Sequence, residues 1–417
     1  MKVACIGGGP AALFTAITLK SRRPDTDITI FERNRFGDTF GFGVVFSDET
    51  LSNIEHADQP SIREVESHFR YWTDLEIRVR DEVFVSDGHG FAALARVELL
   101  NILGRRAAEL GVDIRYETEV TAAEVANADL VIASDGANSA TRNQFVDSFQ
   151  PTIERGETRY LWSGSEAPLE RLPFLFNELE EGWVAAHAYP FDATRSTFIV
   201  EVTGPTFERL GITPAEGLKP GEWDAEAVAF GERVFAEELQ GYPLLVNNTK
   251  WLQFPRAHCK SWRHENMVLL GDAAHTAHFS IGSGTKLALE DAIQLTDSLV
   301  EYGRVDDALE HYESVRRPVT ESLQRAAVVS EEWFETFDHY LDRDSAEFVM
   351  SCMTRSQRVT YDNLRVRDEE FGKLALSSFR SQLPAVDLHP DDDAPPIFHP
   401  LTLGKVTLPN RLGVAPM

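Results

Sequence analysis

The sequence contains little that could crosslink the chain or hold a metal through sulfur. Its 417 residues include three cysteines, Cys5, Cys259 and Cys352, which lie far apart. They form no CxxC pair, so neither a zinc site of that kind nor a disulfide framework is expected. Isolated thiols fit a reducing compartment, and we expect a cytoplasmic protein.

Positive charge is also scarce. Lysine and arginine total 40 against 67 acidic residues, which gives a net charge of -27. Such a surface repels nucleic acid and anionic membranes, so neither is expected as a partner. A membrane span is not expected either, because the apolar N-terminal segment is interrupted by a glycine cluster. An anionic ligand would therefore need a local basic pocket.

The pattern of apolar segments changes along the chain. Residues 3–6 and 28–31 predict short buried strands on either side of a helix that starts near Ala11. From about residue 155 the segments become aromatic and β-branched with alternating polarity, which predicts an antiparallel sheet. The segment MVLLGD, residues 267–272, returns to the buried parallel-strand style. The first domain is therefore expected to be discontinuous in sequence.

The first glycine turn fits the dinucleotide-binding fingerprint G-x-G-x-x-G/A. Gly7 permits a tight turn, Gly9 lets the backbone approach a pyrophosphate, and Ala12 lets helix and strand pack closely. Helix N-terminal amides favour the phosphate charge. Glu32 ends the second strand at about the expected separation of ~20 residues and is predicted to bind a ribose. The predicted cofactor contacts here are Gly7, Gly9, Pro10, Ala11, Ala12, Glu32 and Arg33.

Two later glycine turns also follow apolar strands. Asp135-Gly136 precedes Ser139 and Arg142, and Gly271-Asp272 precedes Gly282 and Gly284. Alone, each could be a turn with an aspartate cap. In order with the fingerprint, they resemble the three motifs of the single-component FAD-dependent aromatic hydroxylases: GxGxxG, DGxxSxxR and GDAAHxxxPxxGxGxN. Arg96 also matches an arginine of that family that contacts the flavin.

The resemblance implies an α/β fold (α+β overall). It would combine a Rossmann-like FAD-binding domain, an inserted antiparallel-sheet substrate domain and a helical C-terminal part. The expected segments are 1–155 and 259–330 for FAD binding, 156–258 for the substrate domain, 331–388 for the helical region and 389–417 for a linker and tail.

The same resemblance implies the cofactor chemistry. NADH or NADPH would reduce FAD, and dioxygen would then form a flavin C4a-hydroperoxide that hydroxylates an electron-rich ring. Asp272 would hold a ribityl hydroxyl, and the amides near Gly284 and Thr285 would face the flavin pyrimidine ring. Asp135 and Arg142 would support the fold and the cofactor region. The implied FAD contacts of the later motifs are Arg96, Asp135, Asp272, Gly282, Gly284 and Thr285.

Departures from the family pattern point to a narrower branch. His278 and Phe279 stand where relatives have proline, and Lys286 replaces the usual asparagine. HFSIGSGT, GFGVVFSDE and RYLWSGS together resemble monooxygenases acting on aryl-CoA thioesters, and also the indole-ring hydroxylase of violacein biosynthesis. The implied reaction converts salicylyl-CoA to 2,5-dihydroxybenzoyl-CoA. A 2-aminobenzoyl-CoA, free aromatic acid or indole substrate, and a catalytically silent FAD-binding scaffold, stay open.

Candidate substrate residues follow from this comparison. His278 is the candidate catalytic group for the phenolic proton. The candidate substrate-binding residues are Phe46, His187, Tyr189 and Phe279, although core packing explains each of them too. A CoA substrate also needs a basic entrance. One arginine-rich stretch offers candidates, although solvated surface side chains are the more frequent explanation: Arg63, Arg70, Arg78 and Arg80.

The final residues carry a different motif. PPIFHPLTLGKVTLPNRLGVAPM resembles the opening of Old Yellow Enzyme-type FMN barrels. Such a barrel needs about 200 further residues, so FMN is expected only where that barrel is present. Fusion of the two modules is a feature of the aryl-CoA branch.

A metal site is the alternative interpretation of HTAH, residues 275–278. His275, His278 and Asp272 could converge on an ion. However, the helix begins after the glycines, so the histidines are expected in a turn rather than on one helix face. We therefore expect no metal. The oligomeric state is not readable from the sequence.

Overall fold

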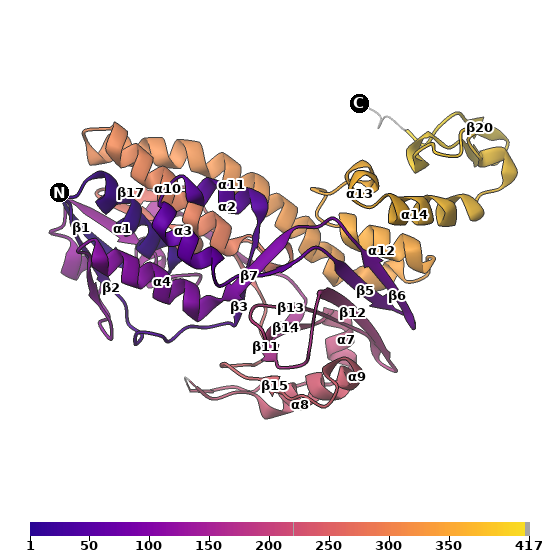
Figure 1. Cartoon of the computed structure of the whole chain (residues 1–417), viewed down its shortest axis with the longest axis horizontal. Helices are drawn as coiled ribbons and strands as arrows, with labels where there is room; N and C mark the ends of the chain where they lie inside the picture. Colours follow the sequence, from indigo (N-terminus) through magenta and orange to yellow (C-terminus); the bar gives the residue numbers. More distant parts are fainter. Residues whose placement is uncertain (220, 413–417) are drawn as a thin grey trace.

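A six-stranded sheet forms the centre of the first layer (Figure 1). The structure, a computed structural model, describes residues 1–219 and 221–412, apart from the side chains of residues 47–50 and 53. Five strands run parallel, and the edge strand β17 (Arg263–His264) is antiparallel. The parallel strands, in spatial order, are β18 (Met267–Leu269), β9 (Leu130–Ala133), β1 (Lys2–Ile6), β2 (Asp27–Phe31) and β8 (Asp113–Arg115).

Helices from distant parts of the chain pack on this sheet. Helix α1 (Pro10–Arg22) contacts both α4 (Arg96–Glu109) and α10 (Gly284–Glu301). The small residues of α1 permit this close packing, as the fingerprint predicted. Both β18 and α10 follow the expected substrate segment in sequence and return to this layer.

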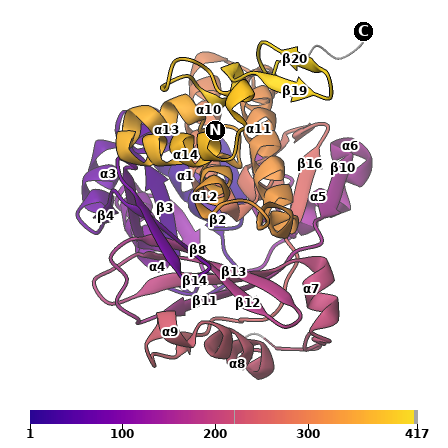
Figure 2. The same cartoon turned by 90° about the vertical axis from the view of Figure 1, so that its right-hand side faces the viewer.

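A seven-stranded sheet forms the second layer. Its central strands are buried on both faces, because α8 (Ala225–Val234) and α9 (Ala236–Leu239) cover one side and the C-terminal helices cover the other (Figure 2). Two strands, β5 and β6, come from within the segment 1–155 and extend this sheet beside β12. The strands, in spatial order, are β15 (Leu244–Leu245), β11 (Arg159–Ser165), β14 (Ser196–Val202), β13 (Gly182–Pro190), β12 (Leu172–Leu179), β5 (Leu75–Val79) and β6 (Glu82–Ser86).

Two smaller sheets connect the layers. Strand β10 (Pro151–Arg155) enters the second layer, and its antiparallel partner β16 (Pro255–Cys259) leaves it. The three-stranded sheet β3 (Gly43–Ser47), β7 (Phe91–Ala95) and β4 (Arg70–Trp72) lies beside α4, and β7 runs directly into that helix. The expected α/β fold with an inserted, mainly antiparallel sheet is confirmed.

Helices make up most of the C-terminal part, as predicted. The long α11 (Val305–Glu335) crosses from the first layer to the second and is followed by shorter helices (Figure 1). These are α12 (Ser345–Thr354), α13 (Tyr361–Arg367) and α14 (Glu369–Ser381). The remaining helices are α2 (Asp48–Glu55), α3 (Gln59–Glu66), α5 (Ala140–Gln144), α6 (Val146–Phe149), α7 (Gly204–Arg209), α8 (Ala225–Val234) and α9 (Ala236–Leu239).

The tail forms a hairpin at one end of the molecule. Strands β19 (Leu401–Leu403) and β20 (Val406–Leu408) pair antiparallel (Figure 1, yellow). Residues 413–417, the end of the barrel-like motif, lie outside the described residues. The relation to an FMN barrel stays a prediction. Within the described part of the chain, no helix combines the length and apolarity needed to cross a bilayer.

One buried carboxylate connects the elements of the first layer. Asp291 on α10 is 0% exposed and accepts a hydrogen bond from the Gly271 amide at 3.2 Å. It also lies 2.7 Å from His275 Nε2 and accepts from Arg316 Nε of α11 at 2.9 Å. Although burial alone would raise it, His275 and Arg316 lower the pKa of Asp291 below its usual value. The carboxylate therefore joins two helices to the turn after β18.

Replacing this carboxylate should destabilise the protein strongly. Asp291→Ala leaves Arg316 without its closest ion pair in the core, which we expect to cost about 3–5 kcal/mol of unfolding free energy. Because the folded pKa is depressed, this stabilisation is present above the unfolded value of about 3.9 and is lost as pH falls through the folded pKa. Urea unfolding at neutral and acidic pH measures both effects.

Asp297→Ala provides a matched control on the same helix. Asp297 forms an exposed ion pair with Arg22, so its loss should cost less than about 1 kcal/mol. Equal destabilisation by the two substitutions would contradict the central role of Asp291.

Candidate active site

The turn between β1 and α1 has the geometry of a phosphate cradle. Gly7 has φ +95°, and a Cβ placed there would lie 2.5 Å from the carbonyl oxygen of Ser134. Gly9 is the N-cap residue of α1, and no side chain caps this helix end. A Cβ placed on Gly9 would have no heavy atom within 4 Å. The first amides of α1 are therefore uncapped and border open space, which suits a pyrophosphate.

Glu32 holds this turn from the end of β2. Its Oε2 accepts the Gly8 amide at 2.7 Å, and its Oε1 accepts the Asn34 amide at 2.8 Å. The carboxylate thus fixes the glycine loop beside the first helix. The predicted contact of Glu32 with a ribose of the cofactor stays a proposal.

The DGxxSxxR segment braces the cofactor region. Asp135 accepts hydrogen bonds from Ser139 Oγ at 2.5 Å and from the Thr141 amide at 3.0 Å. The buried Arg142 guanidinium donates to the carbonyl oxygens of Ala137 at 2.7 Å and Ala273 at 3.1 Å. Arg142 therefore connects this motif to the Gly271-Asp272 turn.

A cavity of about 770 Å³ lies where the later motifs meet, and we name it the smaller cavity. Helix α10 begins at Gly284 without a side-chain cap on its N-terminus, so unpaired amides face this space. The indole nitrogen of Trp162, which lines the cavity, also has no hydrogen-bond partner in the described structure. Seven residues of the predicted FAD site line it: Arg33, Arg96, Asp135, Asp272, Gly282, Gly284 and Thr285.

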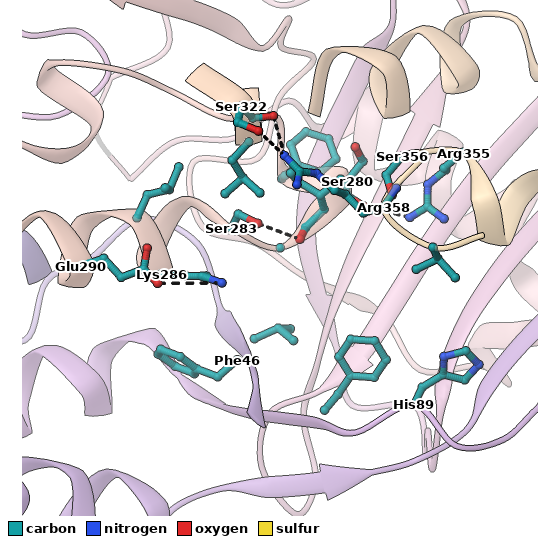
Figure 3. A pocket seen from close by; sticks show the side chains of 18 of the residues that line it. Phe46, His89, Ser280, Ser283, Lys286, Glu290, Ser322, Arg355, Ser356 and Arg358 are labelled. Atoms are coloured by element: carbon teal, nitrogen blue, oxygen red, sulfur yellow. Dashed lines mark hydrogen bonds and ion pairs between the residues drawn. The ribbon is translucent and has the colours of Figure 1, made fainter. Parts of the chain in front are cut away.

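A second cavity of about 1240 Å³ adjoins the first, and we name it the larger cavity (Figure 3). Of the predicted substrate residues, Phe46 lines only the larger cavity, whereas His187, Tyr189 and Phe279 line both. Six residues form this common wall: Val45, His187, Tyr189, Phe279, Gly282 and Ser283. A ligand in one cavity can thus lie against a ligand in the other.

His278 lies behind this wall. It is 2% exposed and is not among the described residues that line either cavity. Its Nδ1 accepts the Ser280 amide at 3.3 Å, and its ring lies 4.1 Å from that of Phe279. Burial, followed by the charge of His187, lowers the pKa of His278 well below the usual value. It is therefore a neutral ring that supports Phe279, and its predicted contact with substrate stays untested.

Two predicted substrate residues, His187 and Tyr189, lie on β13 and have different polar neighbours. Tyr189 donates its hydroxyl to the carbonyl oxygen of Gly43 at 3.0 Å, and burial raises its pKa to about 12. His187 Nδ1 lies 3.2 Å from Glu201 Oε2 on the neighbouring strand β14. Glu201 is 1% exposed and was missed by sequence analysis, although a glutamate inside the apolar strand STFIVEV is a signal.

The histidines of HTAH do not gather a metal site. His275 instead bonds to Asp291, and its ring packs 4.9 Å from Trp262. Among the described residues, no group of three or more histidine, cysteine, aspartate or glutamate side chains could hold an ion.

Comparison with known proteins identifies the family. A profile described as an FAD binding domain matches residues 237–327. Salicyloyl-CoA 5-hydroxylase of Streptomyces sp is 44% identical over 376 residues, 89% of this chain and 72% of that relative. The chain belongs to the FAD-dependent aromatic monooxygenases. It is therefore a flavoprotein oxidoreductase, and NAD(P)H is the co-substrate typical of the family.

Other monooxygenases share the sequence and the fold. The 3-hydroxy-4-methyl-anthranilyl-[aryl-carrier protein] 5-monooxygenase of Streptosporangium sibiricum is 38% identical, covering 80% of this chain and 89% of that relative. The tetrameric form of 2-methyl-3-hydroxypyridine-5-carboxylic acid oxygenase has a TM-score of 0.65 at 19% identity, covering 87% and 97% of the two chains. The latter likeness shows the fold alone.

The residues present fit FAD. The open space beyond Gly9 suits the pyrophosphate, and the smaller cavity offers uncapped amides at Gly284 together with the Asp272 carboxylate. These donors and acceptors match the pyrophosphate, the flavin ring and a ribityl hydroxyl.

Two glycines of the first turn should respond differently to alanine. Gly7→Ala should destabilise the apoprotein by about 1–3 kcal/mol or more, because the φ is unfavourable and Cβ meets the Ser134 carbonyl. Gly9→Ala should change stability by less than about 0.5 kcal/mol. It should nevertheless weaken FAD binding by about tenfold or more, because its Cβ occupies the phosphate approach. Urea unfolding of the apoprotein measures the loss of stability, and FAD titration measures the loss of affinity. A greater loss of stability in Gly9→Ala than in Gly7→Ala, with unchanged FAD affinity in Gly9→Ala, would contradict the assignment of this turn to the pyrophosphate.

Proposed function

We propose that this protein hydroxylates an aryl-CoA thioester, with salicylyl-CoA to 2,5-dihydroxybenzoyl-CoA as the first candidate. The thioester, NAD(P)H, a proton and dioxygen would give the hydroxylated thioester, NAD(P)⁺ and water. The similarity to salicyloyl-CoA 5-hydroxylase supports this substrate class. The three buried free cysteines support a reducing, cytoplasmic location.

The common wall of the two cavities is the observation that carries the proposal. A flavin in the smaller cavity would lie against an aromatic ring in the larger one, at Phe279 and Tyr189. The larger cavity far exceeds what a single aromatic ring fills, which favours a ring attached to a long carrier. A free aromatic acid would leave most of its ~1240 Å³ unused.

Bound FAD supplies the redox chemistry, taking a hydride from NAD(P)H and activating dioxygen. Gly9 and the first turn of α1 would hold its pyrophosphate, and Arg96 and Asp272 would hold its inner part. The uncapped N-terminus of α10 would stabilise negative charge on the ring. Arg96 is positioned by a hydrogen bond from Nε to Thr39 Oγ1 at 3.1 Å.

The protein's own task is to keep the reacting ring dry and to handle its proton. Aromatic side chains line the larger cavity on the sheet side, including Phe46, Phe91 and Phe174, and they exclude water from the ring. His187 lines both cavities, so we assign it to accept the phenolic hydrogen at Nε2. The Glu201 carboxylate lies 3.2 Å from Nδ1 without a hydrogen bond between them in the described structure, and it would balance the charge that the imidazole gains.

A second substrate class has support of its own. The relative from Streptosporangium sibiricum is named for an anthranilyl group on an aryl-carrier protein, which supports 2-aminobenzoyl-CoA as the next candidate. An indole compound comes third, because protodeoxyviolaceinate monooxygenase of Chromobacterium violaceum is 30% identical over 364 residues.

Product formation with a set of matched substrates tests the proposal. Purified holoenzyme is given NADH or NADPH with salicylyl-CoA, 2-aminobenzoyl-CoA or free salicylate, and hydroxylated product is measured against NAD(P)H consumed. We expect stoichiometric product with an aryl-CoA and little with free salicylate. Hydroxylation of the free acid at equal or higher kcat/KM would contradict the proposal.

Glu201 is expected to act as a positioning residue. Glu201→Gln keeps the size but removes the charge beside His187, so kcat for hydroxylation should fall about 10-fold or more. KM for the thioester should change less than about threefold, because Glu201 lies outside both cavity linings. His187→Gln should lower kcat similarly, and the double variant should lower it little further. Additive losses would show that the two residues act separately.

A further inference from the structure

The larger cavity is basic in a protein that is strongly acidic. Among the side chains that the structure describes, five cations line it but only one carboxylate, that of Glu290, whereas the whole chain has a net charge of -27. The cations come from distant parts of the sequence and meet only in the folded chain. They are Lys286, Arg316, Arg355, Arg358 and Arg367.

Two of these cations are already neutralised. Arg316 pairs with Asp291 at 2.9 Å and with Glu290 at 3.3 Å. Lys286 pairs with Glu290 at 3.8 Å (Figure 3). These contacts lie on α10 and α11 and belong to the scaffold of the cavity.

The other three arginines have no direct ion pair in the described part of the chain. Arg355, Arg358 and Arg367 form no ion pair within 4.0 Å among the residues that the structure describes. Arg358 donates to the Ser322 carbonyl at 2.8 Å and to its hydroxyl at 2.7 Å, both of which are neutral acceptors. Arg355 donates to the carbonyl oxygens of Ser280 at 2.8 Å and Cys352 at 2.7 Å.

These arginines are held in place by the fold. The Arg355 guanidinium lies 4.8 Å from the ring of Phe174, so its position is fixed on the cavity wall. Arg367 ends α13, where its carbonyl lies against Gly88 of the segment between β6 and β7. After burial, the charge of Arg367 contributes to lowering the pKa of His89, which also lines the cavity.

The lining of the larger cavity combines two kinds of surface. Phe279 and Tyr189 belong to the wall that it shares with the smaller cavity, whereas Arg358 and Arg367 line it and are exposed to solvent. Figure 3 shows Arg355, Arg358 and Ser356 together, across the pocket from Phe46. Its apolar lining includes Leu172, Leu323 and Met353. A matching ligand has an aromatic ring, a flexible linker and a phosphate group, with the ring and the phosphate at opposite ends of the linker.

We propose that Arg358 and Arg367 bind the phosphates of the coenzyme A carrier while Arg355 guides the pantetheine arm toward the ring site. This assignment rests on the proposed function. Guanidinium groups suit phosphate because they donate paired hydrogen bonds and keep their charge. The arginines that the sequence offered as a CoA entrance, Arg63, Arg70, Arg78 and Arg80, line neither cavity.

The test compares a full carrier with a truncated one. Salicylyl-CoA and salicylyl-N-acetylcysteamine share the ring and the thioester, but only the first has phosphates. The ratio of their kcat/KM values is measured for wild type and for the double variant Arg358→Gln/Arg367→Gln. We expect that ratio to fall about tenfold or more in the double variant, which corresponds to losing two partly exposed charge-assisted contacts.

A matched control removes the same charge elsewhere. Arg263 and Arg304 are surface arginines paired with Glu310 and Asp306. Arg263→Gln/Arg304→Gln should keep the wild-type ratio. An equal fall in both double variants would overturn the proposal, because the effect would then come from overall charge.

Calorimetric titration with free coenzyme A separates this proposal from the proposed function. Binding to wild-type holoenzyme that weakens about tenfold in Arg358→Gln/Arg367→Gln supports the subsite whichever aromatic is hydroxylated. If the double variant hydroxylates salicylyl-CoA with the wild-type ratio of kcat/KM values and binds coenzyme A as tightly as wild type, the phosphate subsite is overturned. The proposed function is then unaffected. Failure of the wild-type protein to bind coenzyme A, with activity only on a carrier-protein thioester, would overturn it as well.

Discussion

The buried carboxylate of Asp291 is the interaction on which the site depends. It connects α10, α11 and the turn after β18 through the Gly271 amide, His275 and Arg316. That turn carries Asp272, and α10 begins with the uncapped amides that line the smaller cavity. These parts are consecutive in sequence and all follow the second layer, so the Asp291 contacts hold the returning segment from β18 to α11 together as one unit.

The second constraint is the common wall of the two cavities. His187 and Tyr189 reach it from the seven-stranded sheet, and Phe279 reaches it from the motif segment before α10. Tyr189 is fixed by the Gly43 carbonyl and Phe279 is packed by His278, so contacts within the protein hold this wall in place. A rigid wall between cofactor and ring would help to protect a reactive oxygen species from water.

The sequence could predict the parts of the site that are encoded locally. The first glycine turn could be predicted from its spacing between strand and helix, whereas Asp135, Arg142 and the later turn were predicted from the resemblance to the family motifs. The sequence could not predict Glu201 beside His187 or Asp291 beside His275, because those contacts join strands and helices that only the tertiary fold brings together. For the same reason, the arginine-rich stretch of residues 63–80 was a poor guide to the basic cavity, whose cations come from three separate helical segments and the loop after α12.

The central claim is that the two cavities let a flavin hydroxylate the ring of a carrier-bound aromatic. The most direct measurement is the mass of the product formed from salicylyl-CoA under isotopically labelled dioxygen with NAD(P)H. The structure predicts one labelled oxygen atom on the aromatic ring, with the thioester intact and with one NAD(P)H consumed per product. Reduction of dioxygen without label in the ring, or label found only when free salicylate is supplied, would contradict it.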